Sequence, residues 1–235
     1  MVAGATERIT IGTSVLVVPY RHPVVLAQEL ASLDRLSEGR IVLGVGSGWM
    51  DEEFAAVGVP KRERGPRTDE SIDLMQRLWE ATQPISFDGR FWRLDEVVLA
   101  SHPHRPGGPP VMVGGNTEPA LRRAGRLGDG WLGMEVFVEQ VAAKREILNR
   151  AAEEAGRDPA AITVSVRRGL VPAFDVTNFL PDRRSIAGGP KDVAGELEAY
   201  AAEGVSLVVL DLALIVPDIL ATMEWLATEV LPLIE

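Results

Sequence analysis

A pair of glycines before a helix start is the feature of this sequence best suited to binding an anion. Gly114 and Gly115 follow a short apolar run, and Asn116 and Thr117 lead into a segment with Pro119 in its first turn. Thr117 is a favoured N-cap residue, and proline is tolerated there because its missing N–H would be unpaired anyway. Glycines let the backbone approach a ligand closely, and free N–H groups at a helix start favour a phosphate. The residues alone leave two alternatives open: a phosphate site or an ordinary strand-to-helix turn.

The titratable residues do not assemble a catalytic group by spacing. The chain has three histidines and no cysteine, which excludes thiolate catalysis, thiolate zinc sites and disulfides. His102 and His104 lie in a Pro/Gly-rich segment without a third ligand at metal-binding spacing, so we expect no metal site. Arg167 and Arg168 follow an expected strand, where one of them could contact an acidic ligand or both could be solvated charges. Trp49 is expected in the core, with contact to a ligand as the alternative. The catalytic residues are therefore unassigned.

The composition is that of a globular protein without a basic surface. The chain has 235 residues, of which 46% are hydrophobic and 25% charged, and its net charge is -10. This charge argues against nucleic acid or an anionic membrane as a partner. No apolar run reaches the ~18 residues of a membrane span, and the N-terminal residues lack the features of a signal peptide. We expect a cytoplasmic protein that binds a small molecule.

Apolar runs typical of strands alternate with amphipathic segments along the chain. The expected strands cover residues 9–18, 40–46, 111–113, 130–133, 162–166 and 205–210. Such alternation predicts an α/β fold with a parallel sheet and right-handed crossovers. Residues 83–110 break the pattern, with a hairpin signal at Asp88-Gly89, and are interpreted as an insertion within one domain spanning residues 1–235. The sheet could be an open doubly wound sheet or part of a (β/α)8 barrel.

Several linked motifs resemble the luciferase-like monooxygenase superfamily. They occupy residues 11–17, 20–23, 33–49, 113–116, 123–131 and 188–190. Within the superfamily, the chain is most similar to the class that uses the deazaflavin coenzyme F420. The resemblance implies a (β/α)8 TIM barrel and an oxidoreductase that transfers hydride through coenzyme F420. An FMN-dependent monooxygenase is the alternative.

The resemblance also implies which residues hold the cofactor. A strand bulge with a non-prolyl cis peptide at Ser14–Val15 would lie behind the isoalloxazine ring. The other cofactor-binding residues would line the channel beside the ring or cradle the phosphate: Gly46, Ser47 and Gly48 in the first group, and Gly114, Gly115, Asn116 and Thr117 in the second.

One departure from the family pattern affects these expectations. Family members usually begin with two further βα units before the strand that starts here at Ile9, so we expect a barrel incomplete at the N-terminus, with six βα units. An open barrel would expose the edges of its first and last strands, which predicts pairing with a second chain, most simply as a homodimer. The missing units also support an alternative from another class, a truncated non-catalytic flavin-binding protein.

Overall fold

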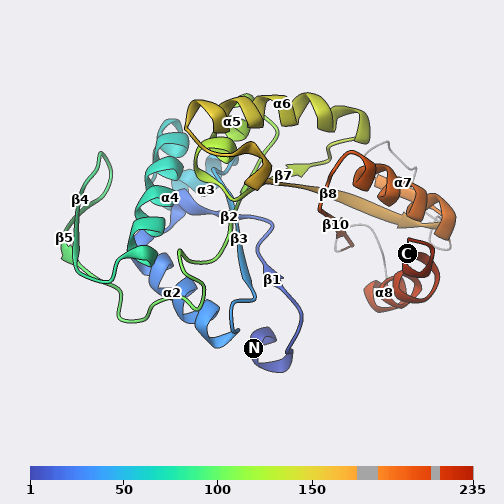
Figure 1. Ribbon diagram of the computed structural model, residues 1–235, viewed down its shortest axis with the longest axis horizontal. Coiled ribbons are helices and arrows are strands. Elements are labelled where there is room, and N and C mark those ends of the chain that lie inside the picture. Colours follow the sequence, from blue (N-terminus) through green and yellow to red (C-terminus); the bar gives the residue numbers. More distant parts are fainter. Residues whose placement is uncertain (174–184, 213–217, 235) are drawn as a thin grey trace.

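The centre of the fold is a curled parallel sheet (Figure 1). The computed structural model describes residues 1–173, 185–212 and 218–234. The strands follow the order β1-β3-β6-β7-β8-β10, while β2 also pairs with β3 and β9 with β8. Their bounds are β1 (Ile11–Gly12), β2 (Leu16–Val17), β3 (Ile41–Gly46), β6 (Val111–Gly114), β7 (Gly130–Met134), β8 (Thr163–Pro172), β9 (Ser185–Gly188) and β10 (Leu207–Asp211). All of these pairings are parallel, as the alternating sequence pattern predicts.

Helices lie around the outside of the sheet (Figure 1). Their bounds are α1 (Val2–Ala5), α2 (Pro23–Leu36), α3 (Asp51–Ala56), α4 (Arg64–Glu80), α5 (Glu118–Leu127), α6 (Val138–Glu154), α7 (Pro190–Ala202) and α8 (Ile219–Trp225). A π-helical turn, Leu226–Val230, continues α8, and short 3-10 helices occur at Val18–Tyr20, Lys61–Glu63, Pro159–Ala161 and Leu231–Leu233. No described helix is long and apolar enough to span a membrane.

The core lies between the strands and these helices. The apolar strand residues Leu43, Val45 and Trp131 are completely buried, as are Met75 of α4 and Leu148 of α6. Burial on both faces explains why these strands are continuous apolar runs, because strands of a helix-covered parallel sheet have no solvent face. The helices, in contrast, keep a polar side in solvent and bury one stripe.

The expected insertion forms a hairpin outside the sheet (Figure 1). Its strands β4 (Ile85–Asp88) and β5 (Arg93–Val97) are antiparallel. The carboxylate of Glu70, on α4, accepts hydrogen bonds from the backbone N–H groups of Arg90, Phe91 and Trp92 in the turn. The chain then returns to the parallel sheet at β6, so the hairpin is an excursion from the βα pattern.

Three strands differ from the sequence expectation, and one of them, β9, was not predicted. The expected strand over residues 9–18 is divided into β1 and β2 by a bulge, and β8 continues six residues beyond the expected end at residue 166. Arg167 and Arg168 therefore lie inside a strand. The periodicity could not predict this, because the guanidinium of Arg168 is buried by tertiary contacts with Glu196 and Tyr200 of α7.

The sheet does not close on itself within the described chain. The strands at its two ends, β1 and β10, each pair on one side only. The curl, the parallel strands and the outer helices together make an incomplete (β/α)8 barrel, as expected. In a fold of this type, ligands bind at the carboxyl ends of the strands.

Candidate functional site

A bulge separates β1 from β2 at the edge of the sheet. Gly12 pairs with Val42 whereas Leu16 pairs with Val45, so the edge segment carries one residue more than β3. The Thr13 hydroxyl donates to the carbonyl oxygen of Gly44 at 2.8 Å across this irregularity. The peptide bond between Ser14 and Val15 is cis. The predicted bulge and cis peptide are thus confirmed.

The second element of the site is the turn between β6 and α5. Gly115 has a φ of +120°, which glycine adopts far more readily than other residues. Thr117 occupies the N-cap position and Pro119 lies in the first turn, as predicted, but the Thr117 hydroxyl makes no capping hydrogen bond. In the described chain, the backbone N–H groups of Asn116, Thr117 and Glu118 have no acceptor. Three unpaired donors at the start of a ten-residue helix suit an anion.

The side chain of Asn116 fixes this turn. Its Oδ1 accepts a hydrogen bond from the backbone N–H of Met134 at 3.0 Å, and its Nδ2 donates to the carbonyl oxygen of the same residue. The ammonium of Lys144 also donates to the Asn116 carbonyl oxygen. The amide of Asn116 is therefore committed to the end of β7, and what it offers to a ligand is its backbone N–H.

A cleft of about 900 Å³ connects these elements at the carboxyl ends of the strands. Eight of the nine predicted cofactor-binding residues line it: Val15, Gly46, Ser47, Gly48, Gly114, Gly115, Asn116 and Thr117. The ninth, Ser14, lies behind Val15, and its hydroxyl is buried without a hydrogen-bond partner in the described chain. The structure thus brings the predicted residues together from three separate parts of the sequence.

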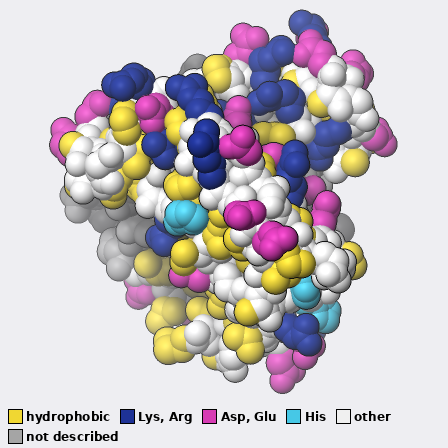
Figure 2. All heavy atoms as spheres, turned by 90° about the vertical axis from the view of Figure 1, so that its left-hand side faces the viewer, with side chains coloured by type: hydrophobic (Ala, Val, Ile, Leu, Met, Phe, Trp, Pro, Cys, Tyr) yellow, Lys and Arg dark blue, Asp and Glu magenta, His cyan; other side chains and the backbone are white. Residues whose placement is uncertain are grey.

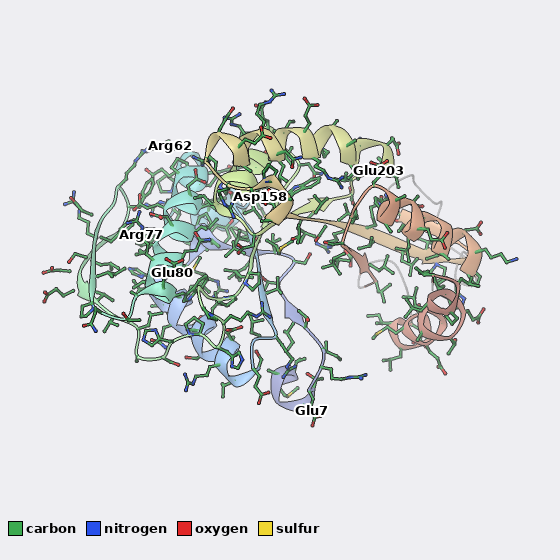
Figure 3. The ribbon with its side chains drawn as sticks, in the orientation of Figure 1. Glu7, Arg62, Arg77, Glu80, Asp158 and Glu203 are labelled. Atoms are coloured by element: carbon green, nitrogen blue, oxygen red, sulfur yellow. The ribbon has the colours of Figure 1, made fainter. Side chains whose placement is uncertain are left out.

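Basic side chains that the sequence interpretation missed also line the cleft. They lie just before α4 and at its first residue: Lys61, Arg62 and Arg64. Lys61 forms an ion pair with Asp51 at 2.7 Å, whereas Arg62 and Arg64 are exposed and have no acidic partner among the described residues. Figure 3 shows Arg62 near the start of α4, away from Arg77 and Glu80 further along the helix. The run Lys-Arg-Glu-Arg was the available signal, but its place beside the glycine turn depends on the fold.

The neighbouring surface is mixed in charge. Figure 2 shows the face that carries α4 and the hairpin, where Lys and Arg side chains gather in the upper part with acidic side chains between them. The uncompensated positive charge at the cleft is therefore local, in a protein whose net charge is -10.

Arg123 is a largely buried basic residue that also lines the cleft. This residue is only 7% exposed, and its guanidinium pairs with Asp69 while it donates to the Ser47 hydroxyl at 3.2 Å and to the Gly65 carbonyl at 3.1 Å. Arg123 ties α5, α4 and the loop after β3 together.

Trp49 and His22 have different surroundings in the structure. Trp49 is 74% exposed and lines the cleft, so its expected place in the core is wrong; the glycine turn before it carries the side chain outward. His22 precedes α2 and meets Trp92 of the hairpin edge to face, with ring centroids 4.7 Å apart. His22 thus makes a contact between the start of α2 and the hairpin.

One phenol, on the 3-10 helix that follows β2, has a raised pKa. Burial, together with a hydrogen bond to Glu53 and the charge of that carboxylate, raises the pKa of Tyr20. Within the described ranges, no Asp, Glu or His lines the cleft, and no cluster of His, Asp or Glu could hold a metal ion. The arrangement can bind an anionic ligand with a flat apolar part against Val15, but its lining offers no general acid or base of the carboxylate or imidazole type.

Comparison with known proteins identifies relatives of one kind. The profile of the family described as luciferase-like monooxygenase matches residues 1–175. An F420-dependent hydroxymycolic acid dehydrogenase of Mycobacterium tuberculosis is 38% identical over 162 residues, which cover 68% of this chain and 44% of that protein. An F420-dependent glucose-6-phosphate dehydrogenase of Amycolatopsis mediterranei is 36% identical over 166 residues, covering 67% and 49%. The chain thus spans about half the length of these relatives.

Solved structures show the same fold. An F420-dependent secondary alcohol dehydrogenase in complex with an F420-acetone adduct superposes with a TM-score of 0.85 at 20% identity, covering 99% of this chain and 82% of that one. The FMN-bound oxygenating constituent of 3,6-diketocamphane monooxygenase from Pseudomonas putida gives 0.78 at 19% identity, covering 98% and 81%. Both cofactor types therefore occur among proteins of this fold.

Proposed function

Because this chain belongs to the luciferase-like monooxygenase family, we propose that it is an oxidoreductase that uses coenzyme F420 for hydride transfer with a small organic molecule. The observation that carries the proposal is the cleft itself. It combines unpaired backbone N–H groups at the start of α5, an apolar wall at Val15 and two exposed arginines without acidic partners. A cofactor with a phosphate, a flat ring and further negative charge fits this set of groups.

Different residues of the cleft would bind different parts of the cofactor. The N–H groups of Asn116, Thr117 and Glu118 would hold the phosphate, and Val15 with Gly46 and Gly48 would border the ring. The Ser14 hydroxyl is buried behind Val15 and does not line the cleft, so we assign it no contact with the cofactor. When bound, the deazaflavin supplies the two-electron redox chemistry; the protein binds it, orients it and excludes water.

The choice of coenzyme F420 over FMN rests on charge. FMN ends at its phosphate, whereas coenzyme F420 continues into an acidic tail. Arg62 and Arg64 lie beside the phosphate turn and are exposed, so they can neutralise such a tail. Two relatives named as F420-dependent dehydrogenases support this preference. A relative named as a monooxygenase, the 4-hydroxyprotoasukamycin monooxygenase, supports the FMN alternative; it is 32% identical over 162 residues.

Titration with each cofactor tests the proposal. Trp49 is exposed in the cleft, so its fluorescence should be quenched when a ring binds nearby. We expect quenching by coenzyme F420 at lower concentration than by FMN, and loss of most of the signal in Trp49→Phe. Tight binding of FMN with no binding of coenzyme F420 would contradict the proposal and favour a monooxygenase.

A second candidate is a binding protein without catalytic activity. The observation that favours it is the absence of an Asp, Glu or His from the cleft lining in the described part of the chain. Turnover separates the two candidates. A protein that binds coenzyme F420 with a 1:1 ratio but reduces it with no alcohol or sugar phosphate would be the binding protein.

We also propose that the chain pairs with a second copy. The outer edges of β1 and β10 are unpaired in the described structure, and unpaired edges favour association. Light scattering at micromolar concentration should give the mass of a dimer; a mass of 25.4 kDa would contradict this part of the proposal.

A further inference from the structure

Arg167 connects strands on opposite sides of the curled sheet. It belongs to β8, and its Nη1 donates to the carbonyl oxygen of Ser14 at 3.2 Å. Its Nη2 forms an ion pair with the carboxylate of Asp211 at the end of β10. Ser14 and Arg167 are 153 residues apart in the sequence. One guanidinium thus bridges the bulge at one edge of the sheet and the strand at the other edge.

The register shows that Arg167 faces the concave side, where the cleft is. Arg167 is aligned with Met134 of β7, which lines the cleft. The next residue, Arg168, is 1% exposed and packs against Tyr200 of the outer helix α7. Because successive strand residues point to opposite faces, the side chain of Arg167 points inward. The Arg167 side chain is 27% exposed and that of Asp211 is 19% exposed, so the ion pair is partly shielded from water.

The contact at Ser14 is adjacent to the wall of the cleft. Val15 follows Ser14 directly and packs between two glycines of the neighbouring strands, Gly46 and Gly114. The position of the Ser14 carbonyl group and that of the Val15 side chain depend on the same backbone. A charged donor makes a stronger hydrogen bond than a neutral one, and an arginine keeps its charge at every pH the protein meets.

We propose that Arg167 is a positioning residue: by holding the Ser14 carbonyl group, it fixes Val15 as the wall against which the cofactor ring lies. Asp211 orients the guanidinium for this contact. The identity of the ligand rests on the proposed function, but the link between Arg167 and the segment around Ser14 does not. Arg167 acts on the part of the cleft formed by Val15. It leaves the turn between β6 and α5, where the phosphate would bind, unaffected.

Hydrogen exchange of the 235-residue chain tests the link without any cofactor. In Arg167→Met, we expect amide exchange of residues 11–18 to rise by at least about fivefold, because a charge-assisted hydrogen bond that restrains the segment is lost. Arg167→Lys keeps a charged donor and should restore part of the protection. Arg150→Met is the control, since Arg150 is exposed and its one ion pair among the described residues is with Glu146 on its own helix.

Ligand titration tests the effect on the ring. Arg167→Met should weaken binding of coenzyme F420 by about tenfold and leave the affinity for inorganic phosphate unchanged. If Arg167 only stabilised the fold, its loss would lower the affinities for coenzyme F420 and for inorganic phosphate together. Asp211→Asn should shift the exchange of residues 11–18 in the same direction by a smaller factor.

Two results would overturn the inference. One is unchanged exchange of residues 11–18 in Arg167→Met; the other is an equal rise in every segment, which would indicate general loss of stability. If the wild-type chain bound neither coenzyme F420 nor FMN, the proposed function would fail. The exchange data would still decide whether Arg167 positions the segment around Ser14.

Discussion

The side chain of Val15 lies against the bare Cα atom of Gly114. A Cβ atom at position 114 would stand 2.9 Å from Val15 Cγ1 and 3.2 Å from the carbonyl oxygen of Val45. Gly46 makes room in the same way, because a Cβ atom there would stand 2.7 Å from Val15 Cγ2. Two glycines on adjacent strands therefore determine where one wall of the cleft lies.

The first prediction concerns this contact. Gly114→Ala should lower the free energy of unfolding by about 1–3 kcal/mol, because the new methyl group overpacks a site closed by backbone. It should also weaken cofactor binding, since Val15 must shift. Urea unfolding and fluorescence titration measure the two effects. The control is Gly195→Ala in α7, where a Cβ atom meets nothing within 4 Å, and where alanine should stabilise the helix by up to about 1 kcal/mol.

The second prediction tests the exposed arginines at the cleft. The double variant Arg62→Glu/Arg64→Glu should weaken coenzyme F420 binding by about tenfold at low salt and FMN binding by less, because only the former carries a long acidic tail. The matched control is Arg77→Glu/Arg150→Glu, which changes the net charge equally at two sites outside the cleft lining. Equal losses of affinity for both cofactors would show that the two arginines do not interact with the acidic tail.

The third prediction concerns Arg123 and its half-buried partner Asp69. Arg123→Met should lower the free energy of unfolding by about 1–2 kcal/mol, because the Gly65 carbonyl loses a donor while Asp69 keeps Arg126 as a partner. The adjacent Arg122 pairs with Glu154 at the surface, with 40% of its side chain exposed. Arg122→Met should therefore change stability by no more than about 0.5 kcal/mol. Similar values for the two variants would contradict the structural role of Arg123.

The fourth prediction is a loss of stability at high pH. Burial raises the pKa of Tyr200 above 10.0, although Arg168 opposes this shift. The unfolded chain ionises this phenol near pH 10 while the native protein holds its proton. The protonated Tyr200 therefore contributes to the free energy of unfolding. This contribution is fully present below pH 10 and is lost as the pH rises through the native pKa. Denaturant unfolding from pH 8 to 11 should show the decline.

Tyr200→Phe identifies the group responsible for that decline. The variant loses the hydrogen bond from the hydroxyl to the Val136 carbonyl, so it should be less stable at pH 8. Its stability should then vary less with pH above 10 than that of the wild type. A decline as steep as that of the wild type would assign the effect to other groups.

Much of the fold and of the candidate site follows from local sequence patterns. Apolar runs alternating with amphipathic segments predicted the parallel sheet, and the Gly114-Gly115 turn before a helix start predicted a place for an anion. Both are local features. A buried strand requires a run of consecutive apolar residues, and a helix start requires its capping residues directly before the first turn. The expected place of Trp49 in the core was wrong, because whether a side chain after a glycine turn points inward depends on what packs there.

Neighbouring residues were sufficient to predict the alternation of strands and helices and the glycine turn, because these features depend on short segments of the chain. The place of Arg62 and Arg64 beside that turn, and the contact of Arg167 with the Ser14 carbonyl group 153 residues away, follow from the folded arrangement. A hydrogen bond requires its two atoms to lie about 3 Å apart. The number of residues between two groups in the sequence does not tell whether the fold brings them that close. The curl of the sheet brings these groups together.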